Sequence, residues 1–139
     1  MEINLKRIDD AFCMEATNSE GNKVVTDAGP AVGGHGQGFR PMQLLLAAIG
    51  SCSAIDVLDI LKKQRQDVKD IQIKVNGERE EGKVPSLFTN IQVHYVLVGD
   101  LDPEKVKRAV ALSMEKYCSV AKTLEKTANI AYTTEVRPL

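Results

Sequence analysis

The chain begins with short alternations of apolar and polar residues, and turn-forming residues separate them. The alternating segments are residues 3–8, 11–17 and 23–26. Asp9-Asp10 and Asn18 to Asn22, which lie between these segments, favour turns. The pattern therefore predicts three short strands in an antiparallel meander. Residues 27–38, which follow, are rich in glycine and predict a flexible loop.

A long helix is predicted from Pro41 to about Gln64. Proline suits the first turn of a helix, and Gly50 is the only poor helix former in this stretch. Up to Ile49 almost every residue is apolar, so we expect this half of the helix to be buried on all sides. The second half, from Ile55, is amphipathic. A single small sheet offers too little cover for such a helix, which suggests that a second subunit packs against it.

The rest of the chain alternates again and then becomes helical. The predicted elements are strands at 71–75 and 91–97 that form a hairpin, a helix from Asp102-Pro103 to Tyr117, a shorter helix capped by Ser119 and running to about Lys126, and a last strand at 130–136. No repeat or linker interrupts this order. The sequence thus predicts one α+β domain over residues 1–139.

Composition excludes several classes of function. The net charge of -1 is close to neutral, and without a basic stripe a nucleic-acid partner is not expected. The longest apolar run, Leu44 to Ile49, is shorter than the roughly 20 residues of a membrane-spanning helix. The first residues also lack the apolar run of a signal peptide. Three cysteines without a framework of pairs favour free or redox-active thiols in a cytoplasmic protein.

Cys52 is one candidate for thiol chemistry. It lies in the long helix, and its neighbours Gly50, Ser51 and Ser53 are small, so they leave room around the sulfur. Asp56 lies one turn further along the same face, where its charge disfavours a thiolate unless a cation offsets it. The alternative is that Cys52 is a small buried residue that only fills space.

Cys118 is the second candidate. It directly precedes Ser119, the expected helix cap, so its sulfur is expected near the positive end of the following helix, where the pKa of a thiol is lowered. Lys116 and Lys122 add positive charge. The alternative is a space-filling role at a corner between two helices. Cys13 lies in a predicted strand and is interpreted as structural.

The two histidines do not indicate a metal. His35 lies in the glycine-rich loop, either as a mobile surface residue or as a lid over a site, and His94 lies in a predicted strand. Two histidines and three cysteines without closely spaced ligand pairs are not a zinc signature. Gly33-Gly34-His35-Gly36 is not a phosphate loop, because no Lys-Ser/Thr follows it. No metal ion or bound cofactor is predicted.

Two segments resemble a known family. Pro41 to Val57 resembles the central-helix signature of the OsmC/Ohr family (osmotically inducible protein C and organic hydroperoxide resistance), and Met114 to Ala121 resembles its second cysteine motif. Two short sequences within these segments are most similar to the YhfA-like branch. They are Cys-Ser-Ala-Ile-Asp-Val and Glu-Lys-Tyr-Cys-Ser-Val, with Arg65 to Val68 between them. The resemblance extends over the whole chain in the same order of elements.

The resemblance implies an OsmC-like fold, an intertwined homodimer with antiparallel sheets wrapped around long central helices. It implies that Cys52 attacks an organic hydroperoxide, that Cys118 resolves the sulfenic acid as a disulfide, and that a dithiol reductant restores both thiols. The site has no metal or cofactor. The residues beside the motifs that are expected to bind the hydroperoxide or another small hydrophobic molecule are Arg40, Met42, Gln43 and Tyr117.

The sequence departs from the peroxidase pattern at two places. Peroxidase members have an arginine in the turn after the second strand and a glutamate just after the helix-opening proline. Here the turn is Asn18-Ser19-Glu20-Gly21, and Met42 and Gln43 follow Pro41. A second hypothesis therefore stays open: an OsmC-like dimer without peroxidase activity that acts as a redox sensor or binds a hydrophobic small molecule.

Overall fold

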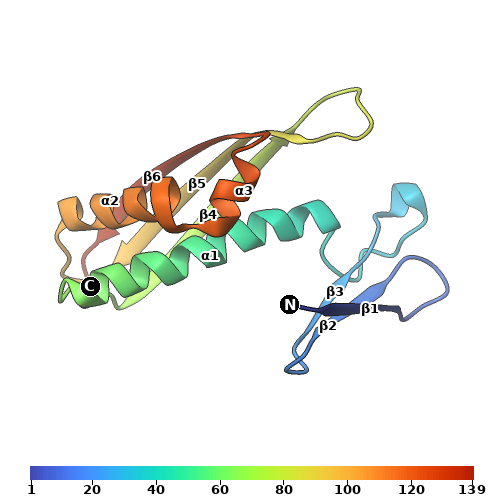
Figure 1. Cartoon of the computed structure of the whole chain (residues 1–139), viewed down its shortest axis with the longest axis horizontal. Coiled ribbons are helices and arrows are strands. Elements are labelled where there is room, and N and C mark those ends of the chain that lie inside the picture. Colours follow the sequence, from blue (N-terminus) through green and yellow to red (C-terminus); the bar gives the residue numbers. More distant parts are fainter. The chain divides into compact units, whose positions relative to one another are not determined.

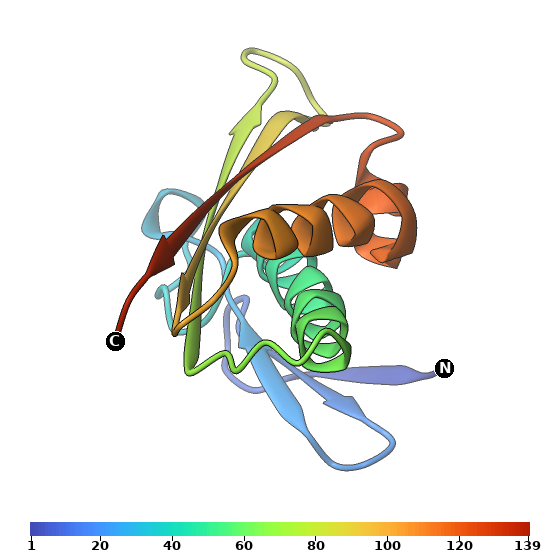
Figure 2. The same ribbon diagram turned by 90° about the vertical axis from the view of Figure 1, so that its left-hand side faces the viewer.

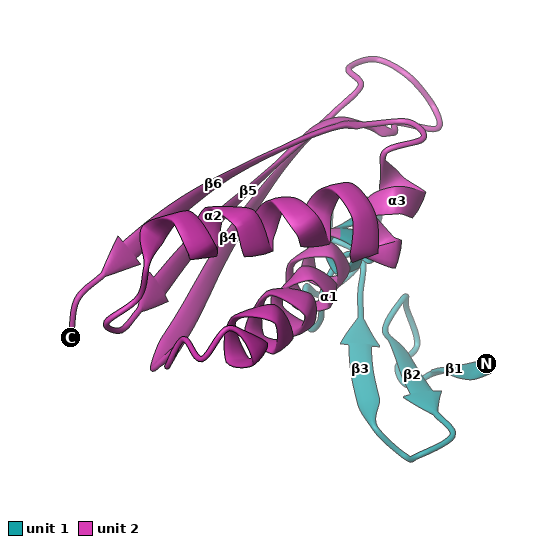
Figure 3. Cartoon of the chain, turned by 60° about the vertical axis from the view of Figure 1, so that its left-hand side comes forward, with its two compact units in different colours: residues 1–45 teal, residues 46–139 magenta.

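The computed structural model describes all residues, 1–139, and divides into two compact units. Figure 3 shows unit 1, residues 1–45, in teal and unit 2, residues 46–139, in magenta. The elements follow the predicted order of three strands, a long helix, two strands, a helical segment and a last strand. This order confirms the α+β class.

Unit 1 is built on a three-stranded antiparallel sheet, as predicted. Its strands are β1 (Ile3–Arg7), β2 (Met14–Asn18) and β3 (Lys23–Thr26), in the order β1-β2-β3. The second strand begins at Met14 rather than at Ala11. The Asp9 side chain explains this difference, because its Oδ1 accepts hydrogen bonds from the N–H groups of Ala11 (2.9 Å) and Cys13 (3.0 Å) and so holds these residues in a turn.

The glycine-rich segment forms a loop, as predicted, but one buried carboxylate organises it. Asp27 is 2% exposed. It accepts hydrogen bonds from the N–H groups of Ala28 (2.8 Å), His35 (3.3 Å) and Gln37 (3.0 Å). A short helical turn, η1 (Pro30–Val32), lies within the loop. The loop therefore has a defined conformation, because a single side chain satisfies three of its backbone donors.

The long helix α1 (Pro41–Lys63) confirms its prediction to within one residue. At its start, the Gln43 Oε1 atom accepts a hydrogen bond of 2.9 Å from the backbone N–H of Arg40. This is half of a capping box, in which the third helical residue reaches back to the N-cap. By length and composition α1 is long and apolar enough to cross a membrane, although its longest uninterrupted apolar run, Leu44 to Ile49, is short. Core helices of globular proteins share this property.

The first half of α1 is partly exposed in the single chain, in line with the expectation that one small sheet offers too little cover for it. Leu45 is 37% exposed, and the buried positions begin at Ile49. They continue at helical spacing through Ser53, Val57 and Leu61. One chain therefore covers a single face of α1, because the sheet of unit 2 is too small to surround the helix.

Unit 2 contains a three-stranded sheet in the order β4-β5-β6. Its strands are β4 (Asp70–Arg79), β5 (Phe88–Val98) and β6 (Asn129–Arg137). The β4–β5 pair is the predicted antiparallel hairpin, extended at both ends. β6 pairs with β5 in parallel, which corrects the expectation of purely antiparallel sheets. The helical segment between β5 and β6 makes this pairing feasible, because it returns the chain to the end at which β5 began.

Two helices follow β5. α2 (Pro103–Leu112) begins as predicted at Asp102, whose side chain accepts a hydrogen bond of 2.9 Å from the N–H of Glu104. The helix continues as a π-helical turn, η2 (Ser113–Tyr117), and α3 (Ser119–Leu124) comes next. The predicted cap Ser119 is the first helical residue of α3, and the N-cap is Cys118 itself.

The helices of unit 2 cover one face of its sheet (Figures 1 and 2). β5 is the central strand, and its residues Ile91, Val93, Tyr95 and Leu97 are buried. Gly50 lets α1 approach β4 closely: a Cβ atom at this position would lie 3.2 Å from Val75 Cγ2. The poor helix former noted in the sequence is therefore used for close packing between helix and strand.

Candidate functional site

The fold of unit 2 brings the two motif cysteines together. Cys52 lies near the middle of α1, and Cys118 lies between η2 and α3. The two thiols are close enough that Cys52 is among the groups that raise the pKa of Cys118. Cys52 is partly exposed, whereas Cys118 has no exposed surface. Sequence spacing could not establish this proximity, because 65 positions separate the two residues in the chain.

Cys118 occupies the N-cap of α3. Its Sγ atom accepts a hydrogen bond of 3.4 Å from the N–H of Ala121, in the position usually taken by a serine or aspartate oxygen. Burial raises the pKa of the Cys118 thiol to about 11, although the hydrogen bond from Ala121 lowers it; the neighbouring Cys52 raises it further. The expected activation by the helix end is therefore outweighed by burial.

Tyr95, from β5, reaches the same place. It is fully buried, and its O–H group lies 2.6 Å from Ser53 Oγ and 3.2 Å from Met114 Sδ. Burial is the main cause that raises the pKa of Tyr95 to about 12, with smaller contributions from the charges of Cys118, Asp56 and Cys52. The tyrosine is thus a neutral hydrogen-bond donor beside the two thiols at physiological pH.

Asp56 is the acidic member of the site. It follows Cys52 by one turn on α1, as the sequence indicated, and its Oδ2 atom accepts a hydrogen bond of 2.9 Å from Ser113 Oγ. Ser113 belongs to η2, and it also lies 3.5 Å from the backbone oxygen of Ser53. This bond ties α1 to the turn that carries Cys118.

We call these residues the thiol cluster. Its members are Cys52, Ser53, Asp56, Tyr95, Ser113, Met114 and Cys118. Its hydrogen bonds join thiols, hydroxyls, a thioether, a carboxylate and backbone groups, and none involves a lysine or an arginine. The cluster of one chain therefore contains an acid but no basic side chain that stabilises a thiolate.

The residues expected to bind substrate lie in several places. Tyr117 is next to Cys118 and 51% exposed, and Lys116 Nζ lies 5.5 Å from its ring centre. Arg40, Met42 and Gln43 belong to unit 1. There the Arg40 Nη1 atom donates a hydrogen bond of 3.1 Å to the backbone oxygen of Gly38, and Gln43 caps α1.

Sequence reasoning missed Tyr95, Ser113 and Met114 as members of the site. Tyr95 falls within a predicted strand and Met114 within a predicted helix, and both side chains are buried. Only the O–H group of Tyr95 and the sulfur of Met114 distinguish these two residues from ordinary apolar residues of the core. A tyrosine in the central strand of a sheet needs a partner for its O–H group, and this requirement was a usable signal.

The family model described as OsmC-like protein matches residues 34–133. The chain belongs to the OsmC family. The protein YhfA of Escherichia coli strain K12 is 54% identical over 97 residues, which cover 69% of this chain and 72% of YhfA. The family recognised from the two cysteine motifs is thereby confirmed, and the YhfA-like character of those motifs with it.

Solved structures show the same fold. A hypothetical protein from Aquifex aeolicus VF5 superposes with a TM-score of 0.86 at 38% identity, covering 99% of this chain and 96% of that chain. An organic hydroperoxide resistance protein OsmC from Legionella pneumophila superposes with a TM-score of 0.73 at 14% identity, covering 97% of both chains. The second match shows the fold alone, and the OsmC-like fold is therefore established.

Proposed function

We propose that this protein reduces organic hydroperoxides with Cys52 as the nucleophile and Cys118 as the resolving cysteine. The observation that carries the proposal is the proximity of these two thiols, one partly exposed and the other buried. A peroxide can reach the exposed sulfur, and the buried sulfur is already in place for the disulfide that follows. The family and the name of the Legionella pneumophila relative support the same chemistry.

The proposed reaction has three steps. The Cys52 thiolate attacks one peroxide oxygen, the O–O bond breaks, and the other oxygen leaves as an alcohol after taking a proton. Cys52 is then a sulfenic acid. The sulfur of Cys118 attacks it, water leaves, and a Cys52–Cys118 disulfide forms. A dithiol reductant returns two electrons and two protons, so that both thiols are restored and the reductant becomes a disulfide.

The different environments of the two thiols suit this division of roles. Burial keeps Cys118 protonated near neutral pH because its pKa is about 11. Cys118 is therefore kept as a thiol until the sulfenic acid forms on the partly exposed Cys52. We assign no cofactor or metal to this reaction.

We also propose that the chain acts as one OsmC-like domain in an intertwined cytoplasmic homodimer. Three apolar side chains of α1, Leu45 (37% exposed), Ile55 (70%) and Leu58 (37%), lie open to solvent in the single chain. A second copy that covers this helix removes their surface from water and leaves an apolar mouth beside Cys52. Such a mouth favours an organic hydroperoxide over hydrogen peroxide. Tyr117, half-exposed beside Cys118, and Arg40, Met42 and Gln43 are the proposed substrate contacts.

A second function is supported by one specific observation. The thiol cluster holds Asp56 and no basic side chain, and a carboxylate near a thiol disfavours its thiolate. A dithiol of this kind suits a slow redox sensor, or a dimer that binds a hydrophobic molecule, in which oxidation is stoichiometric and no turnover follows.

Turnover separates the two functions. Reduced protein is given cumene hydroperoxide, tert-butyl hydroperoxide or hydrogen peroxide with excess dithiothreitol, and peroxide consumption is followed. The enzyme predicts turnover that is fastest with the organic peroxides and that Cys52→Ser abolishes. Cys13→Ala, the matched control, is expected to keep the full turnover, and Cys118→Ser is expected to lose the disulfide intermediate. Consumption no faster than that by dithiothreitol alone, with one disulfide formed per chain, rejects the peroxidase in favour of the sensor.

A further inference from the structure

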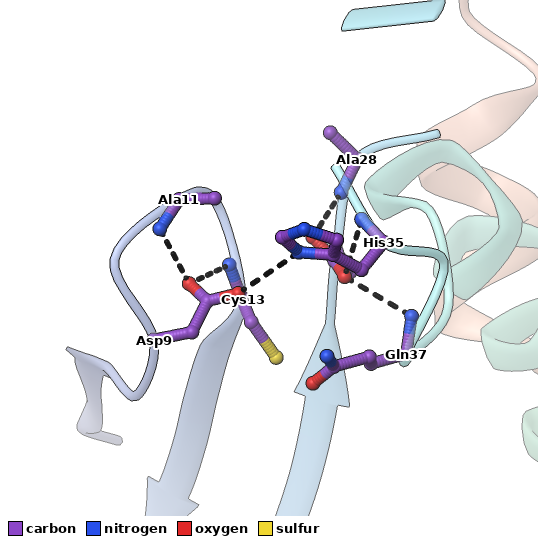
Figure 4. A network of polar contacts seen from close by, with 7 residues as sticks. Asp9, Ala11, Cys13, Ala28, His35 and Gln37 are labelled. Atoms are coloured by element: carbon purple, nitrogen blue, oxygen red, sulfur yellow. Dashed lines mark hydrogen bonds and ion pairs between the residues drawn. The ribbon is translucent and has the colours of Figure 1, made fainter. Parts of the chain in front are cut away.

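A cluster of possible metal ligands lies in unit 1, outside the thiol cluster. Asp9, Asp27 and His35 each offer one possible ligand atom, and these atoms all lie within 4.8 Å of one another. Figure 4 shows the imidazole of His35, on the glycine-rich loop, facing the turn that carries Asp9, with the Asp9–His35 ion pair as a dashed line. The three residues come from separate places in the sequence, so no spaced motif marked them.

One carboxylate oxygen in this cluster lacks a partner. Asp9 Oδ1 accepts two backbone hydrogen bonds, from Ala11 and Cys13. Asp9 Oδ2, by contrast, is buried and accepts no hydrogen bond. A buried carboxylate oxygen without a hydrogen bond or a cation is unfavourable. We therefore expect Asp9 Oδ2 to bind a partner from outside the chain, such as a cation.

The nearest candidate partner of that oxygen is at the wrong distance for a hydrogen bond. His35 Nδ1 lies 3.6 Å from Asp9 Oδ2. A charge-assisted hydrogen bond between these atoms is expected at about 2.7–2.9 Å. Two ligands of a tetrahedral ion with bonds of about 2.1 Å are instead separated by about 3.4 Å. The observed separation is therefore close to that of two atoms that bind the same ion.

Asp27 completes the set with a buried and rigid carboxylate. It is 2% exposed and accepts three backbone hydrogen bonds, from Ala28, His35 and Gln37. The same bonds fix its orientation, as outer hydrogen bonds do for metal-binding carboxylates. Neither Asp9 nor Asp27 has an ion pair with a lysine or an arginine, and the only one formed by Asp9 is that with His35.

We propose that Asp9, Asp27 and His35 bind one divalent transition-metal ion of the zinc class. One imidazole nitrogen and two carboxylate oxygens suit zinc better than magnesium or calcium, which prefer oxygen ligands alone. The bound ion neutralises the buried carboxylates and joins the β1–β2 turn to the glycine-rich loop. This proposal is independent of the peroxidase, since it uses none of the residues of the thiol cluster.

The test is zinc binding by the full-length reduced protein, measured by competition with a chromophoric chelator. One zinc ion per chain is expected. Asp9→Asn and His35→Phe are expected to weaken binding by about 100-fold or more, because each removes a direct ligand. Asp10→Asn, which alters the exposed neighbour of Asp9, is the matched control and is expected to retain full affinity. Far-UV circular dichroism of the metal-free variants checks that they fold.

Two further measurements test whether zinc binds to the thiol pair Cys52 and Cys118 and not to the proposed site. Zinc binding is expected to persist in the Cys52→Ser/Cys118→Ser protein, whose thiol pair is a competing site. Cobalt(II) bound in place of zinc is expected to show weak visible bands without an intense thiolate-to-cobalt charge-transfer band. Any of three results overturns the proposal. These are a zinc content well below one ion per chain, full zinc affinity in both folded ligand variants, and a charge-transfer band that depends on Cys52 or Cys118.

Discussion

The pH dependence of disulfide closure follows from the burial of Cys118. Burial and its neighbours raise the pKa of this thiol to about 11, compared with an ordinary value of 9.0. At neutral pH the thiolate of Cys118 is therefore a small minority, rarer than that of an ordinary thiol. Because the thiolate is the attacking species, closure of the disulfide is expected to accelerate about tenfold per pH unit and about 100-fold between pH 7 and pH 9.

The step can be measured by itself. Reduced protein is mixed with one equivalent of cumene hydroperoxide in a quenched-flow instrument, and N-ethylmaleimide in acid stops the reaction. Intact mass then distinguishes reduced protein, sulfenic acid and disulfide at each time and pH. Cys118→Ser is the control, and it is expected to accumulate the sulfenic acid at every pH. A closure rate that levels off at pH 8 to 9 would contradict the argument, because it would assign Cys118 an ordinary pKa.

Three further predictions concern stability and are measured by urea unfolding. Tyr95→Phe is expected to lower the free energy of unfolding by about 1 kcal/mol, since it removes the buried 2.6 Å hydrogen bond to Ser53; no loss would mean that this bond is not formed in solution. Gly77→Ala is expected to cost about 1–3 kcal/mol, because its Cβ would lie 2.5 Å from Phe88 Cε1, and an unchanged midpoint would contradict this packing. Stability is expected to fall as the pH rises from about 9 to about 11, since the unfolded chain ionises Cys118 at a lower pH than the folded chain; Cys118→Ala should flatten this part of the profile.

Much of the fold could be predicted from the sequence because local signals coincide. Turn residues delimit the first three strands, Pro41 opens the long helix, and Asp102 with Pro103 opens the next. The direction of β6 could not be predicted, because the alternation of its residues is the same in parallel and antiparallel pairs. The cap of α3 was misplaced by one residue because a thiol rarely accepts the capping hydrogen bond.

The candidate site was predicted less completely. The motifs identified Cys52 and Cys118, and in the structure Cys52 is close enough to raise the pKa of Cys118. Tyr95 and the cluster of Asp9, Asp27 and His35 could not be found from spacing, since they are brought together by tertiary packing between distant segments. The exposure of Leu45 shows the opposite case, in which the sequence pattern reports a burial that one chain does not provide.

The central claim is that Cys52 and Cys118 of one chain form a disulfide when a peroxide oxidises the protein. Reduced protein is treated with one equivalent of cumene hydroperoxide, digested at acidic pH and mapped by mass spectrometry without reduction. We expect one peptide pair linked through Cys52 and Cys118, with Cys13 still reduced and no linkage between chains. Oxidation that leaves these two cysteines unlinked, or links either of them to Cys13 or to another chain, would contradict the account.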